Sequence, residues 1–440
     1  MENGSTNIKT HIQLADEAFE KQLTRYNISS NRIIPIVLIC TIVDMLGYMM
    51  VMPLLPFYAQ SFGASDFTIG IIISLNAVTS LFTGPIWGKL SDKYGRKPIL
   101  LICEGGTLLS FIILALSNST SMLMISRIVD GLFGGQIPII QATISDVTTP
   151  RNRSEKMAVM AVAMTVGSIV GPTIGGWLGA LNLVFPAYAA SAMAMVAIIA
   201  TTVIYTDTMP EGRRTELKAE ATKKPGNGKL VLNRTILLRL GQCLGNTLML
   251  SMIFSSLSLI LNAKYGSTST EIGNVMAFMG VCTFVFGGVL MKKMKDRVGD
   301  QRLLLIGIVL LLASYVVMPT LPTFTSFFIF VVIFNAGTNF VRPILSTNLS
   351  RAVGADKQGA ISGYSTTVNS LGRSISPLIA TAWLQMGGMT LLGFHVNEYY
   401  MIAFSGILFG LLLLNLYLVD QRTSDLGDDY VMPLGLGAED

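Results

Sequence analysis

The chain has 440 residues, of which 51% are hydrophobic and only 13% are Asp, Glu, Lys or Arg. A soluble globular protein is about 25% charged, so this composition excludes a multidomain soluble enzyme, a disordered protein and a nucleic-acid-binding protein. The net charge is +5, and the four cysteines lie in apolar runs without a C-x-x-C pair, which indicates neither a zinc site nor a redox pair. The sequence therefore predicts a protein that crosses a membrane many times.

The predicted elements are membrane-spanning helices, because a helix needs about 20 apolar residues to cross the hydrocarbon core. A polar N-terminal segment, 1–32, shows no cleavable signal sequence. Twelve apolar runs follow, at 33–58, 68–88, 98–116, 121–145, 156–180, 184–206, 235–262, 271–291, 303–319, 323–349, 359–384 and 398–419. We expect an all-α fold with six-helix bundles at 33–206 and 235–419, a flexible linker at 207–234 and a polar tail at 420–440.

Lys and Arg residues lie almost entirely in alternate links between the runs. They gather in the N-terminal segment, at 89–97, at 151–156, in the linker and at 292–302, whereas Lys264 lies on the other side. Because basic loops stay cytosolic, both termini are expected in the cytosol. The links are short and offer no aromatic platform, which argues against a nucleic-acid surface.

The two halves repeat a pattern at an offset of about 205 residues. The matching pairs are Gly84 and Gly288, Asp92 and Asp296, Gly95 and Gly299, Pro138 and Pro343, Gly167 and Gly372, and Pro172 and Pro377. Each half has an even number of spans, so the halves are parallel copies around an axis along the membrane normal. Rocking of two such bundles can open a central substrate site to either side in turn.

The link after the second span has the pattern G-x-L-x-D-x-x-G-R-K. Its defining residues are Gly88, Asp92, Gly95, Arg96 and Lys97. Arg96 can pair with Asp92 and with Asp146 at the end of the fourth span, and Asp92 is placed to cap the next helix. The pattern is either a latch that holds one conformation or a basic loop that only sets topology. The second half has Asp300 where the first has Arg96, which predicts a weaker latch.

The fifth span is rich in small residues, namely Gly167, Gly171, Pro172, Gly175 and Gly176. Small residues let membrane helices pack closely, and proline removes a helical hydrogen bond. The run is therefore either a kinked seal between the bundles or ordinary helix packing.

Together these motifs resemble the major facilitator superfamily. The glycine-rich link matches its motif A, the fifth span resembles motif C of its exporter branches, and Arg127-x-x-x-Gly131 resembles motif B. Asp44-x-x-Gly47 and the following Met52–Pro56 segment are similar to the first span of twelve-span drug:proton antiporters, including tetracycline exporters. The resemblance implies the major facilitator fold, proton-coupled export, a latch that holds the outward-open state and a sealing role for motif C.

Charges inside the predicted spans are costly unless they are paired or functional. Six residues qualify: Asp44, Glu104, Arg127, Asp130, Arg342 and Arg373. Asp44 lies about 11 residues, or about 16 Å, into the first span, near the middle of the bilayer. A carboxyl group there is able to take up and release protons. Arg127 would then be a nearby cation that makes this exchange depend on conformation, unless Asp44 stands in a permanent ion pair.

The other intramembrane charges have two readings each. Asp130 follows Arg127 by three residues, so it is either its partner or a second proton site. Glu104 either titrates or snorkels to the interface. Arg342 and Arg373 either bind an anionic substrate or pair with an acid of the first half. All three acids are in the first half, so we expect proton handling there.

Polar residues at mid-span are candidates to line the substrate cavity. They are Tyr48, Tyr58, Asn76, Gln136, Gln141, Asn246, Asn335, Asn339 and Asn369, besides Arg342 and Arg373. No P-loop, H-E-x-x-H or G-x-S-x-G motif occurs, so we expect no catalytic residue, metal or cofactor.

The sequence as a whole favours a monomeric antiporter that exports amphipathic organic molecules and is driven by a proton gradient. Its partners would be the small-molecule substrate, protons and the lipid bilayer, in the cell membrane or an organelle membrane. The alternatives are a symporter or facilitator of an anionic metabolite, a transporter-like receptor or scaffold, and an intramembrane enzyme. Motif C argues against the first, Asp44 and the latch against the second, and the missing catalytic motifs against the third.

Overall fold

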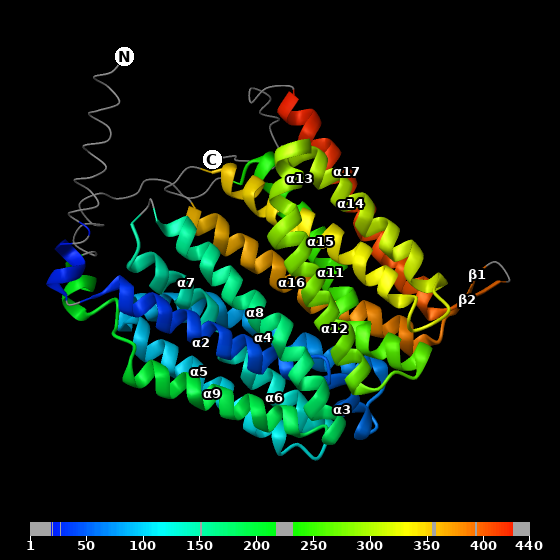
Figure 1. The fold of residues 1–440 in the computed structure, drawn as a ribbon, viewed down its shortest axis with the longest axis horizontal. Coiled ribbons are helices and arrows are strands. Elements are labelled where there is room, and N and C mark those ends of the chain that lie inside the picture. Colours follow the sequence, from blue (N-terminus) through cyan, green and yellow to red (C-terminus); the bar gives the residue numbers. More distant parts are fainter. Residues whose placement is uncertain are drawn as a thin grey trace, which may run out of the picture.

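The computed structural model describes residues 19, 21–26, 28–149, 152–216, 232–353, 358–391 and 394–425. Figure 1 shows that these residues are almost entirely helical. The first half contains α2 (Ser30–Val51), α3 (Leu55–Ser61), α4 (Asp66–Tyr94), α5 (Arg96–Ala115), α6 (Thr120–Leu132), α7 (Gln136–Asp146), α8 (Arg153–Leu181) and α9 (Phe185–Val203). The second half contains α11 (Arg234–Tyr265), α12 (Ser269–Thr283), η1 (Phe284–Leu290), α13 (Met291–Val298), α14 (Asp300–Val317), η2 (Met318–Thr320), α15 (Phe327–Arg351), α16 (Gln358–Met386) and α17 (Glu398–Asp425).

Eleven helical segments of the described chain are long and apolar enough to cross a membrane. The helix α16 coincides with the predicted run 359–384 and has 29 residues, the same length as α4 and α8. It packs between α4 of the first half and α11 of the second. The chain is therefore a multi-pass integral membrane protein built from two helical bundles.

Three predicted spans are interrupted. The first ends as α2 at Val51, just before Pro53, and continues as the short helix α3. The fourth breaks between α6 and α7 at Phe133–Gly135, where two adjacent glycines leave the backbone free to depart from a helix. The eighth passes through η1, a π-helical segment that contains Gly287 and Gly288. Hydropathy alone does not report such breaks, because the apolar run continues through each of them.

One short sheet adds to the helices. The strands β1 (Met389–Leu391) and β2 (Phe394–Val396) pair antiparallel in the link before α17, with Met389 opposite Val396. This hairpin projects from the helical body (Figure 1). It lies outside the membrane-spanning part, whose all-helical prediction is confirmed.

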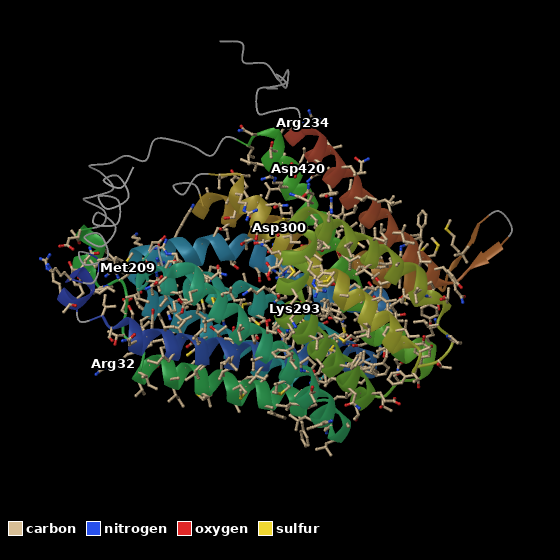
Figure 2. All side chains as sticks on the ribbon, turned by 45° about the horizontal axis from the view of Figure 1, so that its top comes forward. Arg32, Met209, Arg234, Lys293, Asp300 and Asp420 are labelled. Carbon is tan, nitrogen blue, oxygen red and sulfur yellow. The ribbon has the colours of Figure 1, made fainter. Side chains whose placement is uncertain are left out.

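The two halves lie side by side, the first from blue to green and the second from green to red in Figure 1. We name the face of the molecule that carries Arg96, Arg153, Arg213, Arg234 and Arg351 the basic face, and the other the opposite face. Figure 2 shows Arg32 and Met209 at the basic end of the first half, and Arg234 and Asp420 at that of the second.

Two clusters of buried apolar side chains hold the bundles together. The larger one runs through the second half and continues into the opposite-face end of the first half, at Val51, Leu55, Ile72 and Leu123. A separate cluster fills the basic end of the first half and includes Tyr205. The two halves thus share a hydrophobic core toward the opposite face, while the basic end of the first half is packed independently.

Candidate functional site

The halves make their closest contacts at the opposite face. A Cβ atom built on Gly176 of α8 would lie 2.8 Å from the Cα atom of Gly273 on α12, so these backbones touch. Gly70 of α4 abuts Thr381 of α16 in the same way. The Ser258 hydroxyl of α11 donates to the carbonyl oxygen of Pro53 at 2.7 Å. These contacts close the opposite face.

The basic ends of the same helices are apart. On α4, a Cβ atom added to Gly84 or Gly88 would meet nothing within 4 Å, and the same holds for Gly363 near the basic end of α16. The close contact between α4 and α16 is thus at Gly70 and Thr381, and these three glycines nearer the basic face have free space beside them. The interface between the halves is therefore open to the basic face.

Asp44 lies on α2 with its side chain half-buried. Its Oδ2 atom is shielded and has no hydrogen-bond partner among the described residues. The carboxyl group interacts electrostatically with two other acids, Glu104 and Asp130. In this conformation Asp44 therefore has no ion-pair partner among the described residues. Arg127 pairs with Asp130, and its role as a nearby cation that makes proton exchange at Asp44 depend on conformation stays a prediction.

Arg127 and Asp130 form a buried ion pair on α6. Arg127 Nη1 lies 3.4 Å from Asp130 Oδ2, and the Arg127 side chain is fully buried. Asn76 Nδ2 of α4 donates to the same oxygen at 2.7 Å, and the Ser110 hydroxyl of α5 donates to Asp130 Oδ1 at 3.3 Å. Asp130 is therefore the ion-pair partner of Arg127, and Asn76 is hydrogen-bonded to the same carboxylate.

Glu104 on α5 is buried, with 1% of its surface exposed, and does not snorkel. Its Oε1 atom accepts a hydrogen bond from the Thr201 hydroxyl of α9 at 2.8 Å, and its Oε2 atom has no partner among the described residues. Thr201 Oγ1 also lies 3.6 Å from Cys40 Sγ, one turn before Asp44 on α2. The first half thus holds two carboxyl groups with an unsatisfied oxygen.

Motif A is assembled around Arg96. Its guanidinium pairs with Asp92 at 2.6 Å and with Asp146 at 2.8 Å, and it donates to the Ser91 hydroxyl at 2.7 Å. The Arg96 side chain is 6% exposed, whereas that of Asp92 is 62% exposed. All these partners belong to the first half, so the network stands intact while the basic face is open.

The start of α5 is capped by Asp207 and not by Asp92. Asp207 Oδ1 accepts from the backbone N–H groups of Arg96 at 2.9 Å and Lys97 at 3.4 Å, where the positive end of the helix dipole favours an anion. Gly95 has φ +107°, and a Cβ there would collide with the Asp207 carboxylate. The Lys97 ammonium donates to the Thr202 carbonyl oxygen at 2.8 Å.

Residues 207–216 are fixed to the basic face, so a linker that is flexible from residue 207 is wrong. Arg213 donates to the Asp146 carbonyl oxygen at 2.8 Å, and Arg214 donates to that of Lys93 at 2.8 Å. Burial lowers the pKa of Arg213, and the Asp146 carboxylate opposes that shift. Arg25 of the N-terminal segment pairs with Glu216 at 2.6 Å. The remaining linker, 217–231, lies outside the described residues.

The second half has a matching network with inverted charge. Asp300 pairs with Lys295 at 3.1 Å and with Arg351 at 3.6 Å. Asp300 occupies the place of Arg96, and Arg351 at the end of α15 occupies that of Asp146 at the end of α7. Asp300 thus replaces Arg96 at the centre of the cluster, with two cations as its partners, and the weaker latch expected for this half stays a prediction.

The residues of motif C on α8 pack against two different helices, α2 of the same half and α12 of the second half. Gly167, Gly171 and Gly175 pack on α2 of their own half, where added Cβ atoms would collide with Met45, Met49 and Met50. Gly176 alone of the four glycines abuts the second half, and the Pro172 carbonyl oxygen lies next to Gly273. Pro172 lies inside the continuous helix α8. The motif thus contacts the second half at Pro172 and Gly176, and Ile169 within the same segment packs against Gly280 of α12.

Several predicted cavity residues have partners in the structure. Gln136 Nε2 donates to the Thr107 hydroxyl at 2.6 Å, and Asn369 Oδ1 accepts from Thr247 at 2.6 Å. Asn335 Oδ1 accepts from Thr283 at 3.2 Å, and Asn339 donates to the Asn335 carbonyl oxygen at 2.8 Å. Asn246 is buried and its Oδ1 atom has no partner among the described residues.

Other predicted cavity residues differ in their surroundings. Tyr58 donates to the Ser117 carbonyl oxygen at 2.9 Å, at the opposite-face end of the first half and away from the central interface. Tyr48 on α2 interacts electrostatically with Arg373 of the second half. The side chain of Gln141 on α7 is exposed. Arg342 and Arg373 are also exposed.

A sequence model of the Major Facilitator Superfamily matches residues 37–377 and 239–428. The chain belongs to the Major Facilitator Superfamily.

Curated members of this superfamily include several similar proteins. "Multidrug resistance protein 2" of Bacillus subtilis (strain 168) is 27% identical over 395 residues, covering 86% of this chain and 93% of that protein. "Tetracycline resistance protein, class H" of Pasteurella multocida is 27% identical over 366 residues, covering 79% and 88%. "Quinolone resistance protein NorA" of Staphylococcus aureus (strain MRSA252) is 28% identical over 353 residues, covering 77% and 86%.

Solved structures show the same superfamily fold. The human organic anion transporter MFSD10 (TETRAN) has a TM-score of 0.66 at 20% identity, covering 89% of this chain and 100% of that one. A bacterial homologue of the human lysosomal transporter Spinster has a TM-score of 0.66 at 15% identity, covering 89% and 96%. At these identities the likeness shows the fold alone.

Two residues of the candidate site, Asp207 and Thr201, are not part of the superfamily motifs. Asp207 lies in a polar stretch that looks like the beginning of a linker, and Thr201 lies in an apolar run. The one local signal for Asp207 was its position: it is an acidic residue soon after a membrane helix, on the same face of the membrane as the start of α5. No sequence signal joined Thr201 to Glu104, because their contact depends on the packing of α5 against α9.

Proposed function

We propose that this superfamily member exports amphipathic organic molecules from the cell in exchange for protons. It would act as a single chain in the cell membrane, as a transporter and not as an enzyme, driven by the proton gradient without a bound cofactor. The relatives named as multidrug, tetracycline and quinolone resistance proteins support this reading over most of the chain. The two-bundle fold and the one-sided contact between the halves support alternating access.

The observation that carries the proposal is the Asp44 carboxyl group. It lies near the middle of α2 with an oxygen that has no hydrogen-bond partner among the described residues. A charge inside the membrane is costly without a partner, so a proton on Asp44 removes that cost. With the basic face open, Asp44 releases its proton toward the cytosol and the substrate enters the interface between the halves.

Closure of the basic face then carries the substrate to the other side. The contacts of Gly176 with Gly273 and of Gly70 with Thr381 must break for the opposite face to open. Asp44 takes up a proton from that side as the substrate leaves, and the protonated protein returns. Export is coupled because Asp44 alternates between protonated and charged states as the two bundles rock.

The test is an assay of lumenal pH in proteoliposomes that contain a trapped pH-sensitive dye and no initial pH gradient. Addition of an amphipathic substrate, such as a tetracycline or a quinolone, should raise the lumenal pH, because substrate entry drives protons out. Protein-free liposomes control for passive permeation.

The same assay separates the runner-up functions. A symporter of an anionic metabolite would lower the lumenal pH as it carries protons in with the substrate. A facilitator would accumulate substrate without a protein-dependent pH change, and a receptor or scaffold would transport nothing. Any of these three outcomes would overturn the proposed antiport.

A further inference from the structure

Arg342 on α15 and Arg373 on α16 carry charges that the protein itself does not neutralise. Both side chains are exposed, and neither has a hydrogen-bond or ion-pair partner among the described residues. Arg127, the other intramembrane arginine, is fully buried and paired with Asp130. Arg342 and Arg373 thus differ from Arg127 in both exposure and ion pairing.

The two guanidinium groups lie near each other, and that of Arg373 lies near the first half. Arg342 and Arg373 are close enough to interact electrostatically with each other. Arg373 also interacts electrostatically with Tyr48 on α2 of the first half. Asn369 lies one turn before Arg373 on the same face of α16 and is held by Thr247 of α11. The region around the two arginines is therefore bordered by α2, α11, α15 and α16.

Two unpaired cations within membrane-spanning helices repel each other and are costly. A ligand with a negative group reduces both the repulsion between the arginines and the cost of their charges. A guanidinium group binds a carboxylate, sulfonate or phosphate through paired hydrogen bonds. We propose that the exported substrate is an amphipathic organic anion whose negative group binds between Arg342 and Arg373. This inference rests on the proposed function and specifies its substrate class. The apolar body of the substrate would lie against the surrounding helices.

The test uses three probes that share one fluorophore and differ in charge. Dansylglycine carries a carboxylate, its amide is neutral, and the dansyl derivative of ethylenediamine carries an ammonium group. Binding to the purified full chain in detergent is measured by equilibrium dialysis. Paired charge-assisted hydrogen bonds should make dansylglycine bind at least about tenfold more tightly than the amide, and the cationic probe should bind most weakly.

The variants assign that preference to the two arginines. R342Q/R373Q should bind dansylglycine and its amide equally, whereas R342K/R373K should keep part of the preference because it keeps the charges. R302Q, which removes an exposed arginine of the basic face, is the matched control and should behave as wild type. Equal binding of all three probes to wild type would overturn the proposal, as would a preference for the cation or a preference that survives in R342Q/R373Q.

The comparison of the three probes on wild type tests the proposal by itself, so it stands even where a variant misfolds. In the lumenal pH assay, an alkaline shift with the neutral and cationic probes but not with dansylglycine would keep the proposed antiport and reject the anion. Preferential binding of dansylglycine without any pH shift would keep the anion site and reject proton coupling. If the arginines instead serve as partners for first-half acids in another conformation, the charge of the probe will not affect its binding.

Discussion

Arg96 and Asp300 occupy equivalent positions in the two halves and carry opposite charges. Arg96 lies between Asp92 and Asp146, and Asp300 lies between Lys295 and Arg351. Each network is complete within its own half while the basic face is open. The repeat has therefore exchanged the charge at two positions, Arg96 with Asp300 and Asp146 with Arg351, whereas Asp92 is matched by Asp296 and Lys295 is a partner without a charged counterpart in the first half.

The two networks should differ in their contribution to stability. Arg96 is 6% exposed and Asp146 is 15% exposed, so R96A leaves a largely buried carboxylate without its ion-pair partner and should destabilise the fold by about 3 kcal/mol. Arg351 is 64% exposed, and R351A should cost less than about 1 kcal/mol. Thermal unfolding of both variants in one detergent measures the difference. Equal losses of stability in R96A and R351A would show that the burial of Arg96 does not make its network the more stabilising one.

The cap of α5 gives a second prediction. Asp207 accepts from the N–H groups of Arg96 and Lys97 at the positive end of a helix dipole. D207A should therefore destabilise the protein by about 1–2 kcal/mol, and D207N should lose less because its amide oxygen still accepts. E211A, which changes an exposed acid of the same segment, is the control. Unchanged melting of D207A would mean that this segment does not support motif A.

A third prediction concerns the contact between Gly176 and Gly273. A valine at position 176 would overlap the α12 backbone, and overpacking of about 1–3 kcal/mol is enough to move a two-state equilibrium. G176V should populate a state in which the opposite face is open. G84A is the control, because a Cβ at Gly84 would meet nothing within 4 Å.

Spin labels at the exposed Gln60 and Thr323 report the separation of the halves at that face, and the four native cysteines are buried. The distance distribution should lengthen in G176V and stay that of wild type in G84A. An unchanged distribution in G176V would show that this contact does not hold the opposite face closed.

The helices were predictable because membrane spans follow directly from apolar length. The run 98–116 corresponds to α5 (Arg96–Ala115), and 184–206 to α9 (Phe185–Val203). The breaks were not predictable from hydropathy, since Pro53, Gly134 and Gly135 lie inside continuous apolar sequence. Their local signals were present, but membrane helices tolerate both residue types.

The candidate site was predictable in residue type but not in pairing. Spacing predicted that Arg127 can pair with Asp130, and the structure shows this pair. Sequence could not place Glu104 against Thr201, nor Asp207 against Arg96, because these partners are about 100 residues apart and meet only through helix packing. For the same reason it could not tell which arginines lack a partner.

We infer that Asp44 couples substrate export to protons. The most direct measurement is transport of a tetracycline or quinolone substrate into proteoliposomes with an acidic lumen, compared among wild type, D44N, D44E and E155Q. Glu155 is a surface acid whose side chain is 68% exposed, so E155Q serves as the matched control. The gradient should drive accumulation by wild type and E155Q, partial accumulation by D44E, and no accumulation by D44N. Gradient-driven accumulation by D44N at the wild-type level would contradict this inference.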